Sequence, residues 1–186
     1  FLAQHSVPHV LAWCFPKSPG HHAVGFDNQK SGRAIAEHVI SYGHRKLGVI
    51  AGLRDGNDRA QDRILGIQDA INAHPNIQLL GLQECKYSFE EAGSALDELL
   101  LGPVHPTAII CGSDVLAVGA MLRARDLGLQ IPEDISITGF DDINLARVTT
   151  PGLTTVRVPQ HDMGRKAAHV LLGLLDADAP QPQSYE

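Results

Sequence analysis

The chain has 186 residues, of which 44% are hydrophobic and 19% charged, a balance typical of globular domains. Its formal net charge of -6 argues against a binder of the phosphate backbone, because nucleic-acid contacts depend on clusters of Lys and Arg. The three cysteines form no CxxC pair, so a disulfide framework or zinc site is not predicted and a reducing compartment fits better. No apolar run is long enough to cross a membrane, so no membrane partner is predicted.

Short apolar runs alternate with longer segments of helical period, which is typical of an α/β fold built on parallel sheets with helices on both faces. The predicted strands cover residues 7–13, 23–26, 47–51, 79–83, 108–111, 135–138 and 154–158. The predicted helices cover residues 32–42, 62–73, 88–101, 114–128 and 162–175. The Pro- and Gln-rich tail, residues 176–186, is expected to be frayed.

The segment from about residue 31 to 137 contains complete strand-helix units and could form its own sheet. Residues 1–29 supply two strands without the helices that should flank them. A parallel sheet needs cover on both faces. We therefore interpret the chain as one whole lobe with fragments of a second lobe.

Polar groups follow four of the predicted strands, and the carboxyl ends of parallel strands point the same way. These groups are Asp27-Asn28, Arg54-Asp55, Ser113-Asp114 and Asp141-Asp142. We expect them to converge on one crevice, joined by Arg63 from the following helix. A guanidinium among carboxylates suits a small polyhydroxylated or anionic ligand, and Phe26 or Trp13 could offer an apolar face to a sugar ring.

Each of these residues also has an ordinary structural interpretation. Asp after a strand usually caps the next helix, and the same holds for Ser113 and Asp114. Arg63 in a helix is usually a surface or ion-pair residue, and Phe26 and Trp13 are more often core. Their joint convergence is what favours a ligand site.

Signatures of catalysis and of metal binding are missing from the sequence. The ten histidines show no metal spacing such as HExxH, and neither GxGxxG nor GxSxG occurs. The sequence therefore predicts a binding module rather than an enzyme, with no cofactor and no metal.

Several of these motifs stand together in an order that resembles the ligand-binding domain of the lactose-repressor and galactose-repressor family of bacterial transcriptional regulators. The resemblance runs from about Val7 to Leu175. It is carried by residues 24–28, 43–47, 63–66, 107–111, 113–114, 117–120, 131–142, 151 and 153–155.

The resemblance implies a type I periplasmic-binding-protein fold, with two α/β lobes joined by three crossovers, in a cytoplasmic homodimer that binds a small effector and controls operator DNA. It assigns residues 1–30 and 138–156 to remnants of the N-terminal lobe, and residues 31–137 and 157–186 to the C-terminal lobe. The DNA-binding headpiece of the family is expected to be absent from this chain.

The family's effector contacts fall on Phe26, Asp27, Arg63, the Ser113-Asp114 turn and Asp141. The family often has Asn at the position of Ser113, so a water could be needed to bridge the shorter hydroxyl to a ligand. A sugar or sugar acid is the favoured effector among the sugar, sugar-acid and purine sensors of the family. The alternatives are a periplasmic solute-binding protein of a sugar transporter, which shares the fold, and an α/β enzyme with an unrecognised site.

Overall fold

The protein is described by a computed structural model that covers residues 7–15, 20–175 and 183–185. The chain divides into two compact units. The first is formed by residues up to Asn28 together with those from Pro159 onward, and the second by Gln29–Val158. The second unit is therefore one continuous stretch of chain inserted into the first.

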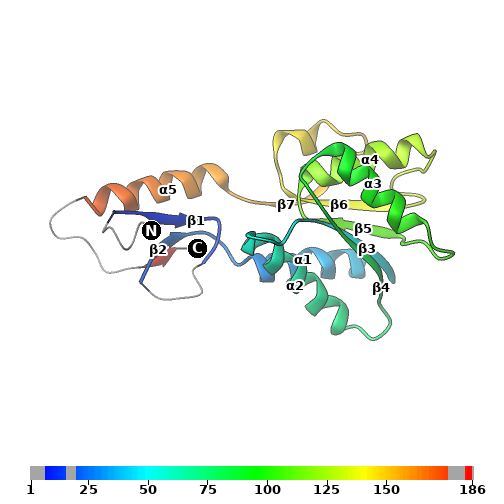
Figure 1. Cartoon of the computed structure of the whole chain (residues 1–186), viewed down its shortest axis with the longest axis horizontal. Coiled ribbons are helices and arrows are strands. Elements are labelled where there is room, and N and C mark those ends of the chain that lie inside the picture. Colours follow the sequence, from blue (N-terminus) through cyan, green and yellow to red (C-terminus); the bar gives the residue numbers. More distant parts are fainter. Residues whose placement is uncertain (1–6, 16–19, 176–182, 186) are drawn as a thin grey trace. The chain divides into compact units, whose positions relative to one another are not determined.

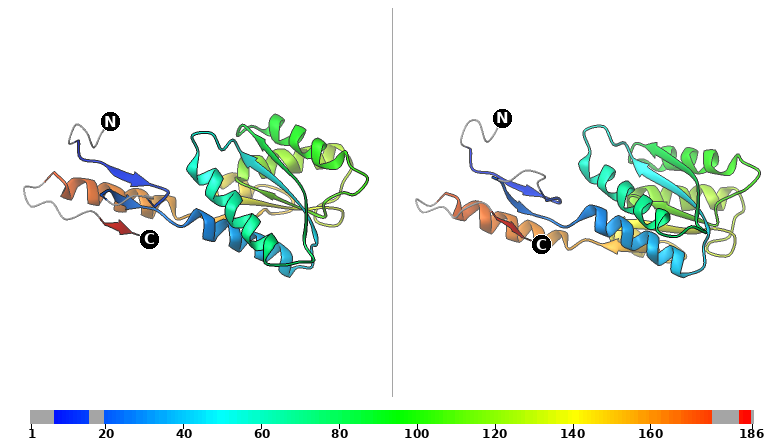
Figure 2. Two further views of the ribbon diagram at one scale, coloured as in Figure 1. Left: turned by 60° about the horizontal axis from the view of Figure 1, so that its bottom comes forward. Right: turned by 90° about the horizontal axis from the view of Figure 1, so that it is seen from below.

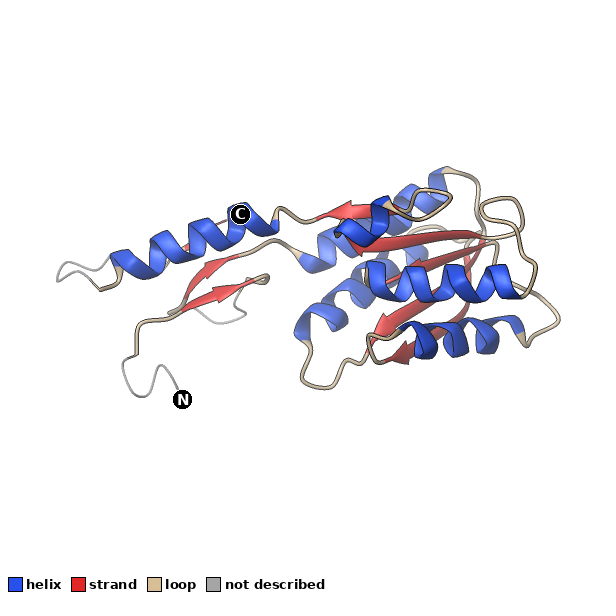
Figure 3. Ribbon diagram, turned by 90° about the horizontal axis from the view of Figure 1, so that it is seen from above, coloured by secondary structure: helices blue, strands red, loops and turns tan. Residues whose placement is uncertain are grey.

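The second unit is built on a five-stranded parallel sheet (Figure 1). In spatial order its strands are β4 (Gln78–Cys85), β3 (Lys46–Gly52), β5 (Ala108–Cys111), β6 (Ser136–Asp141) and β7 (Thr154–Arg157). Helices α1 (Asn28–Ser41) and α2 (Asp58–Asn72) cover one face, and α3 (Phe89–Leu100) and α4 (Asp114–Asp126) cover the other (Figures 2 and 3). This arrangement confirms the predicted parallel α/β fold.

Alternation along the central strands supplies both faces of the sheet with core residues. In β3, Val49 and Ala51 pack with α1 and α2, whereas Ile50 packs with α3 and α4. In β5, Ile110 belongs to the first of these cores and Ile109 to the second. A strand buried on both faces appears in the sequence as a continuous apolar run. This is why the predicted bounds of β3 and β5 agree closely with the observed ones.

Two glycines bring α1 and α2 into backbone contact. A Cβ on Gly32 of α1 would overlap the carbonyl of Arg63, and a Cβ on Gly66 of α2 would overlap the carbonyl of Gln29. Only glycine allows this approach, because any side chain would push the two backbones apart. The pair therefore fixes the position of α2, which carries Arg63.

The first unit holds a small parallel sheet in the order β1 (Val10–Ala12), β2 (His22–Val24) and β8 (Ser184–Tyr185). Helix α5 (Gln160–Gly173) packs on β1 and β2. The expectation of a frayed tail is wrong for residues 184 and 185, because they pair with β2. Residues 176–182 of that tail lie outside the described residues.

The boundary between the units differs from the predicted assignment of the lobes. Residues 138–156 do not join the first unit, because β6 pairs with β5 and β7 pairs with β6 in the sheet of the second unit. Residues 159–186 join the first unit instead, with α5 on β1 and β2. The helical period of α5 predicts a helix but does not say which sheet it covers.

The sequence missed some elements besides β8 and placed the starts of others too late, as for α1, which begins at Asn28 rather than at residue 32. The 3-10 helix η2 (Asn144–Arg147) was not predicted, and α2 begins at Asp58 rather than at residue 62. The N-terminal cap of α2 is Asn57, whose side-chain oxygen accepts a hydrogen bond from the backbone N–H of Ala60 at 3.2 Å. Asn at the position before a helix is a favoured cap, so this start was readable from the sequence.

Candidate functional site

The candidate site lies at the carboxyl edge of the second unit's sheet. From β3 the chain passes through α2 to β4, and from β5 it passes through α4, on the opposite face, to β6. The chain thus runs outward from β3 toward one end of the sheet and outward from β5 toward the other end, so the strand order reverses between β3 and β5. In open α/β sheets, ligands bind outside the carboxyl ends of the strands where the order reverses in this way.

Arg63 is a buried cation at this edge. The residue is 7% exposed, and its Nη1 donates a hydrogen bond of 2.7 Å to the carbonyl oxygen of Gly112, which follows β5. Its guanidinium carbon lies 3.7 Å from the centroid of the Phe140 ring, within the range of a cation-π contact. Burial lowers the pKa of Arg63, and the nearby Asp141 carboxylate opposes that shift. An arginine is nevertheless charged at any physiological pH.

Asp141 faces this cation from the end of β6. Its Oδ1 lies 3.5 Å from Nη2 of Arg63, and its side chain is 21% exposed. Burial raises the pKa of Asp141 to about 6; Arg63 acts to lower it and Asp114 to raise it further. Pairing with a cation does not offset the cost of desolvation here, so the carboxylate is held at the edge in a destabilised form.

The backbone at Asp141 and Asp142 is in an unusual conformation. Asp141 has φ of 113° and Asp142 has φ of 52°, a region that non-glycine residues enter at a cost of about 1–3 kcal/mol each. The side chain of Asp142 turns to cations of the same unit, with its Oδ2 accepting a hydrogen bond of 2.6 Å from Nε of Arg157. The strained turn therefore directs two successive carboxylates to different partners.

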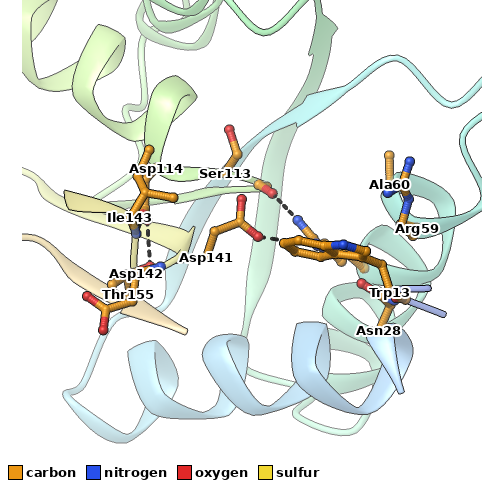
Figure 4. Close-up of polar contacts among 12 residues, drawn as sticks. Trp13, Asn28, Arg59, Ala60, Ser113, Asp114, Asp141, Asp142, Ile143 and Thr155 are labelled. Atoms are coloured by element: carbon orange, nitrogen blue, oxygen red, sulfur yellow. Dashed lines mark hydrogen bonds and ion pairs between the residues drawn. The ribbon is translucent and has the colours of Figure 1, made fainter. Parts of the chain in front are cut away.

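Ser113 and Asp114 have well-defined structural roles. Ser113 caps α4, and its hydroxyl accepts a hydrogen bond from the backbone N–H of Leu116 at 3.3 Å. The Asp114 carboxylate is fully buried and accepts hydrogen bonds from the Thr155 hydroxyl at 2.5 Å and the Ile143 N–H at 2.8 Å (Figure 4). Burial raises the pKa of Asp114, an effect that the bond from Thr155 opposes. Asp114 therefore ties the start of α4 to the segments on both sides of η2.

The glycine before this turn explains why the predicted strand ended too early. A Cβ on Gly139 would overlap the Asp114 carboxylate. Gly139 thus allows a close approach inside β6 and does not end it, and the strand continues to Asp141. Asp141 is consequently part of the sheet edge, whereas the sequence placed it in the following loop.

Sequence reasoning missed a phenol at the same edge. Tyr87 follows β4, and its hydroxyl lies over Gly52 at the end of β3, where a Cβ would overlap it. The side-chain amide of Asn57 donates a hydrogen bond of 3.3 Å to this hydroxyl. Tyr87 also interacts electrostatically with Arg63. Tyr87 stands two residues beyond the end of β4, a strand to which the rule of polar groups just after a strand was not applied.

The remaining predicted contacts lie in the first unit. Trp13 has φ of 74°, and its carbonyl oxygen accepts a hydrogen bond of 2.8 Å from the side-chain amide of Asn28. Phe26 is partly buried and Asp27 is exposed. The structure thus brings Arg63 and Asp141 together with the Ser113-Asp114 turn within the second unit, and contact of Trp13, Phe26 and Asp27 with a ligand stays a prediction.

Neither a metal centre nor a membrane segment emerges from the part of the chain that the structure describes. Within residues 7–15, 20–175 and 183–185, no group of three His, Cys, Asp or Glu side chains is placed to hold a metal ion. No helix among these residues combines the length and the apolar character needed to span a bilayer.

The chain is similar to proteins of known family. The model of periplasmic-binding-protein-like domains matches residues 36–186. The chain belongs to this family. It is also homologous to LacI-family regulators, which confirms the resemblance found in the sequence.

One curated relative is the HTH-type transcriptional repressor PurR of Shigella sonnei (strain Ss046), 32% identical over 178 residues that make up 95% of this chain and 52% of the relative. The chain thus spans about half the length of the curated relatives it matches. A putative transcriptional regulator LacI from Bacillus cereus subsp. cytotoxis NVH 391-98 has a similar structure, with a TM-score of 0.89, 28% identity and coverage of 98% of this chain and 65% of that one. The transcriptional regulator CelR in complex with cellobiose gives a TM-score of 0.88 at 26% identity, covering 98% of this chain and 57% of that chain.

Proposed function

We propose that this chain is the effector-sensing region of a bacterial transcriptional regulator and acts by binding a small metabolite rather than by catalysis. The observation that carries the proposal is the buried Arg63-Asp141 pair at the carboxyl edge of the sheet. A desolvated cation beside a carboxylate of raised pKa is costly for folding alone, and such pairs gather at functional sites. The homology to regulators supports the same reading.

The proposed ligand is a sugar or a sugar acid. The guanidinium of Arg63 donates several hydrogen bonds in a fixed plane, and Asp141 can accept hydrogen bonds from hydroxyls, so the pair suits a polyhydroxylated molecule. The cellobiose complex of CelR shows that a protein of this fold and 26% identity binds a sugar. Tyr87, Ser113, Trp13, Phe26 and Asp27 are retained as further proposed contacts.

In the proposed mechanism, the ligand shifts the population between two arrangements of the protein. It can do so only by as much as it binds one arrangement better than the other. Arg63 and Asp141 are well placed to make the ligand prefer one arrangement. Burial has already removed most of the water around both groups, so ligand hydroxyls can supply hydrogen bonds that water does not. Their interaction with the ligand then offsets part of the cost that the unliganded protein carries.

Calorimetric titration of the 186-residue chain against a panel of sugars, sugar acids and nucleobases tests the binding site. We expect Arg63→Met and Asp141→Asn each to weaken the ligand that binds by about 10- to 100-fold, the usual effect of losing a charged hydrogen bond. The matched controls are Arg123→Met and Asp97→Asn, which remove an ion pair between α4 and α3, with Nε and Oδ1 2.8 Å apart. Equal losses in the controls and the site variants would contradict the assignment.

The activity of the whole protein follows as part of the proposal. A regulator of this family would act in the cytoplasm as a homodimer and bind operator DNA through a separate headpiece. The competing proposal of a transporter's solute-binding protein shares the fold, but the named relatives are regulators. Gel-shift measurements on the whole encoded protein, with and without the ligand found by calorimetry, distinguish the two, because only a regulator changes its DNA affinity.

A further inference from the structure

A hollow lies at the edge of the same sheet opposite to the candidate site. It has a volume of about 290 Å³ and is bordered by Ser136 and Thr154, the first residues of β6 and β7. Arg63 and Asp141 lie at the carboxyl ends of the strands, so this hollow at their amino ends is separate from the candidate site. Its volume suffices for a small ring compound, since cavities of about 150 Å³ already bind benzene.

The sheet is open where it borders this hollow. Strand β7 first pairs with β6 at Thr138, opposite Thr154, although β6 already pairs with β5 from Ser136. Residues 136 and 137 therefore have no strand partner on the β7 side among the described residues. An unpaired strand edge offers backbone hydrogen-bonding groups to whatever occupies the adjacent space.

A buried hydroxyl also borders the hollow. Thr138 is 4% exposed, and its Oγ1 has no hydrogen-bond partner among the described residues. Buried polar side chains are nearly always hydrogen-bonded, so a buried hydroxyl without a partner suggests that a bound molecule supplies one. A hydroxyl can both donate and accept, which makes Thr138 able to engage a hydroxyl or a carboxylate of a ligand.

The other residues that line the hollow indicate the charge and polarity of a ligand that would fit. The rings of His38 and Tyr42 stand together with centroids 5.0 Å apart, and Val39 and Leu153 add apolar walls. No Asp or Glu is among the residues that border the hollow. Burial, and then the neighbouring Arg45, lowers the pKa of His44, which favours the neutral form of that ring. A neutral or anionic molecule with an apolar body therefore fits better than a cation, which would find no carboxylate here.

We propose that this hollow is a second small-molecule site, which takes a ring-sized compound bearing a hydroxyl or carboxylate group that hydrogen-bonds Thr138. The site is independent of the proposed effector site, because the two lie at opposite edges of the sheet and share no residue.

Three probes with the same ring test the proposal on the whole 186-residue chain: benzoate, benzyl alcohol and benzylamine. Chemical shifts of the backbone amides are followed during titration by nuclear magnetic resonance. We expect benzoate and benzyl alcohol to shift the amides of residues 136–138 and 152–154 in a saturable way, and benzylamine to bind at least about tenfold more weakly. Thr138→Val keeps the side-chain shape and removes the hydroxyl, so it should weaken benzoate about tenfold.

The control for the loss of a threonine hydroxyl is Thr149→Val, because Thr149 lies outside this hollow and its hydroxyl donates to the Ala146 carbonyl at 3.1 Å. It should leave benzoate affinity unchanged. The proposal is overturned if the shifts map elsewhere, if none of the probes binds at about 10 mM, or if Thr138→Val binds benzoate as well as the parent does. Arg63→Met should bind benzoate like the parent, which separates this site from the proposed effector site.

Discussion

Replacement of Asp141 by Asn is expected to stabilise the unliganded protein near neutral pH. The pKa of Asp141 is raised from 3.8 to about 6, mainly because the carboxyl is buried. A group whose pKa is raised by folding favours the folded state when it is protonated, and this contribution is lost as pH rises through the folded-state pKa. Asn has no proton to lose, so the variant escapes that loss.

The magnitude follows from the difference between the two pKa values. At about 1.4 kcal/mol for each tenfold change in proton affinity, the shift from 3.8 to about 6 corresponds to about 3 kcal/mol. Because the side chain is 21% exposed, we expect about 2 to 3 kcal/mol. Relative to Asp141→Asn, the parent protein should lose this amount of unfolding free energy between pH 4 and pH 7, with little further change above pH 7.

Urea denaturation of both proteins between pH 4 and pH 8, followed by circular dichroism, measures this difference. Every other titratable group is common to the two proteins, so its contribution cancels in the comparison. Asp97→Asn serves as the control for removing a paired carboxylate from the surface between α3 and α4. A difference between parent and Asp141→Asn that stays constant from pH 4 to pH 8 would refute the claim that Asp141 is held at a cost.

Two further substitutions and one chemical measurement test the packing. Gly66→Ala should lower the free energy of unfolding by about 1–3 kcal/mol, because the new methyl group overlaps a carbonyl of α1. Gly164→Ala should raise the free energy of unfolding by about 0.5–1 kcal/mol, because open space surrounds Gly164 in α5. Urea denaturation measures both changes. Burial raises the pKa of the Cys85 thiol to about 11 and that of the Cys111 thiol further still. Ellman's reagent should therefore leave both thiols unmodified in the native protein and react with them in urea, and rapid labelling of either under native conditions would contradict their burial.

The sequence predicted the elements of the fold well because their signals are local. Strand β5 was located to the residue, since a short apolar run between polar residues allows few other readings. The assignment of segments to units failed because it depends on pairing between strands. Nothing in residues 138–156 alone shows that β6 lies beside β5, and the resemblance was applied with its crossovers in the wrong places.

The candidate site was predictable to a similar extent. The rule that polar groups after parallel strands converge placed Arg63 and Asp141 together, and the structure brings them within 3.5 Å. The rule could not show that Asp114 would be enclosed by Thr155 and Ile143, because those hydrogen bonds depend on the path of the chain around η2. The strained turn at Asp141 was not predictable either, because neither composition nor residue spacing indicates that an Asp adopts a positive φ.

The insertion of one unit into the other has a consequence for biosynthesis. When the ribosome has released residues up to Val158, the second unit has its whole sheet and its α-helices α1 to α4, whereas α5, which packs on β1 and β2, has not yet been made. Helix α5 begins only at Gln160, after about 130 residues of intervening chain. The contact of α5 with β1 and β2 can therefore form only after the whole inserted unit has been synthesised.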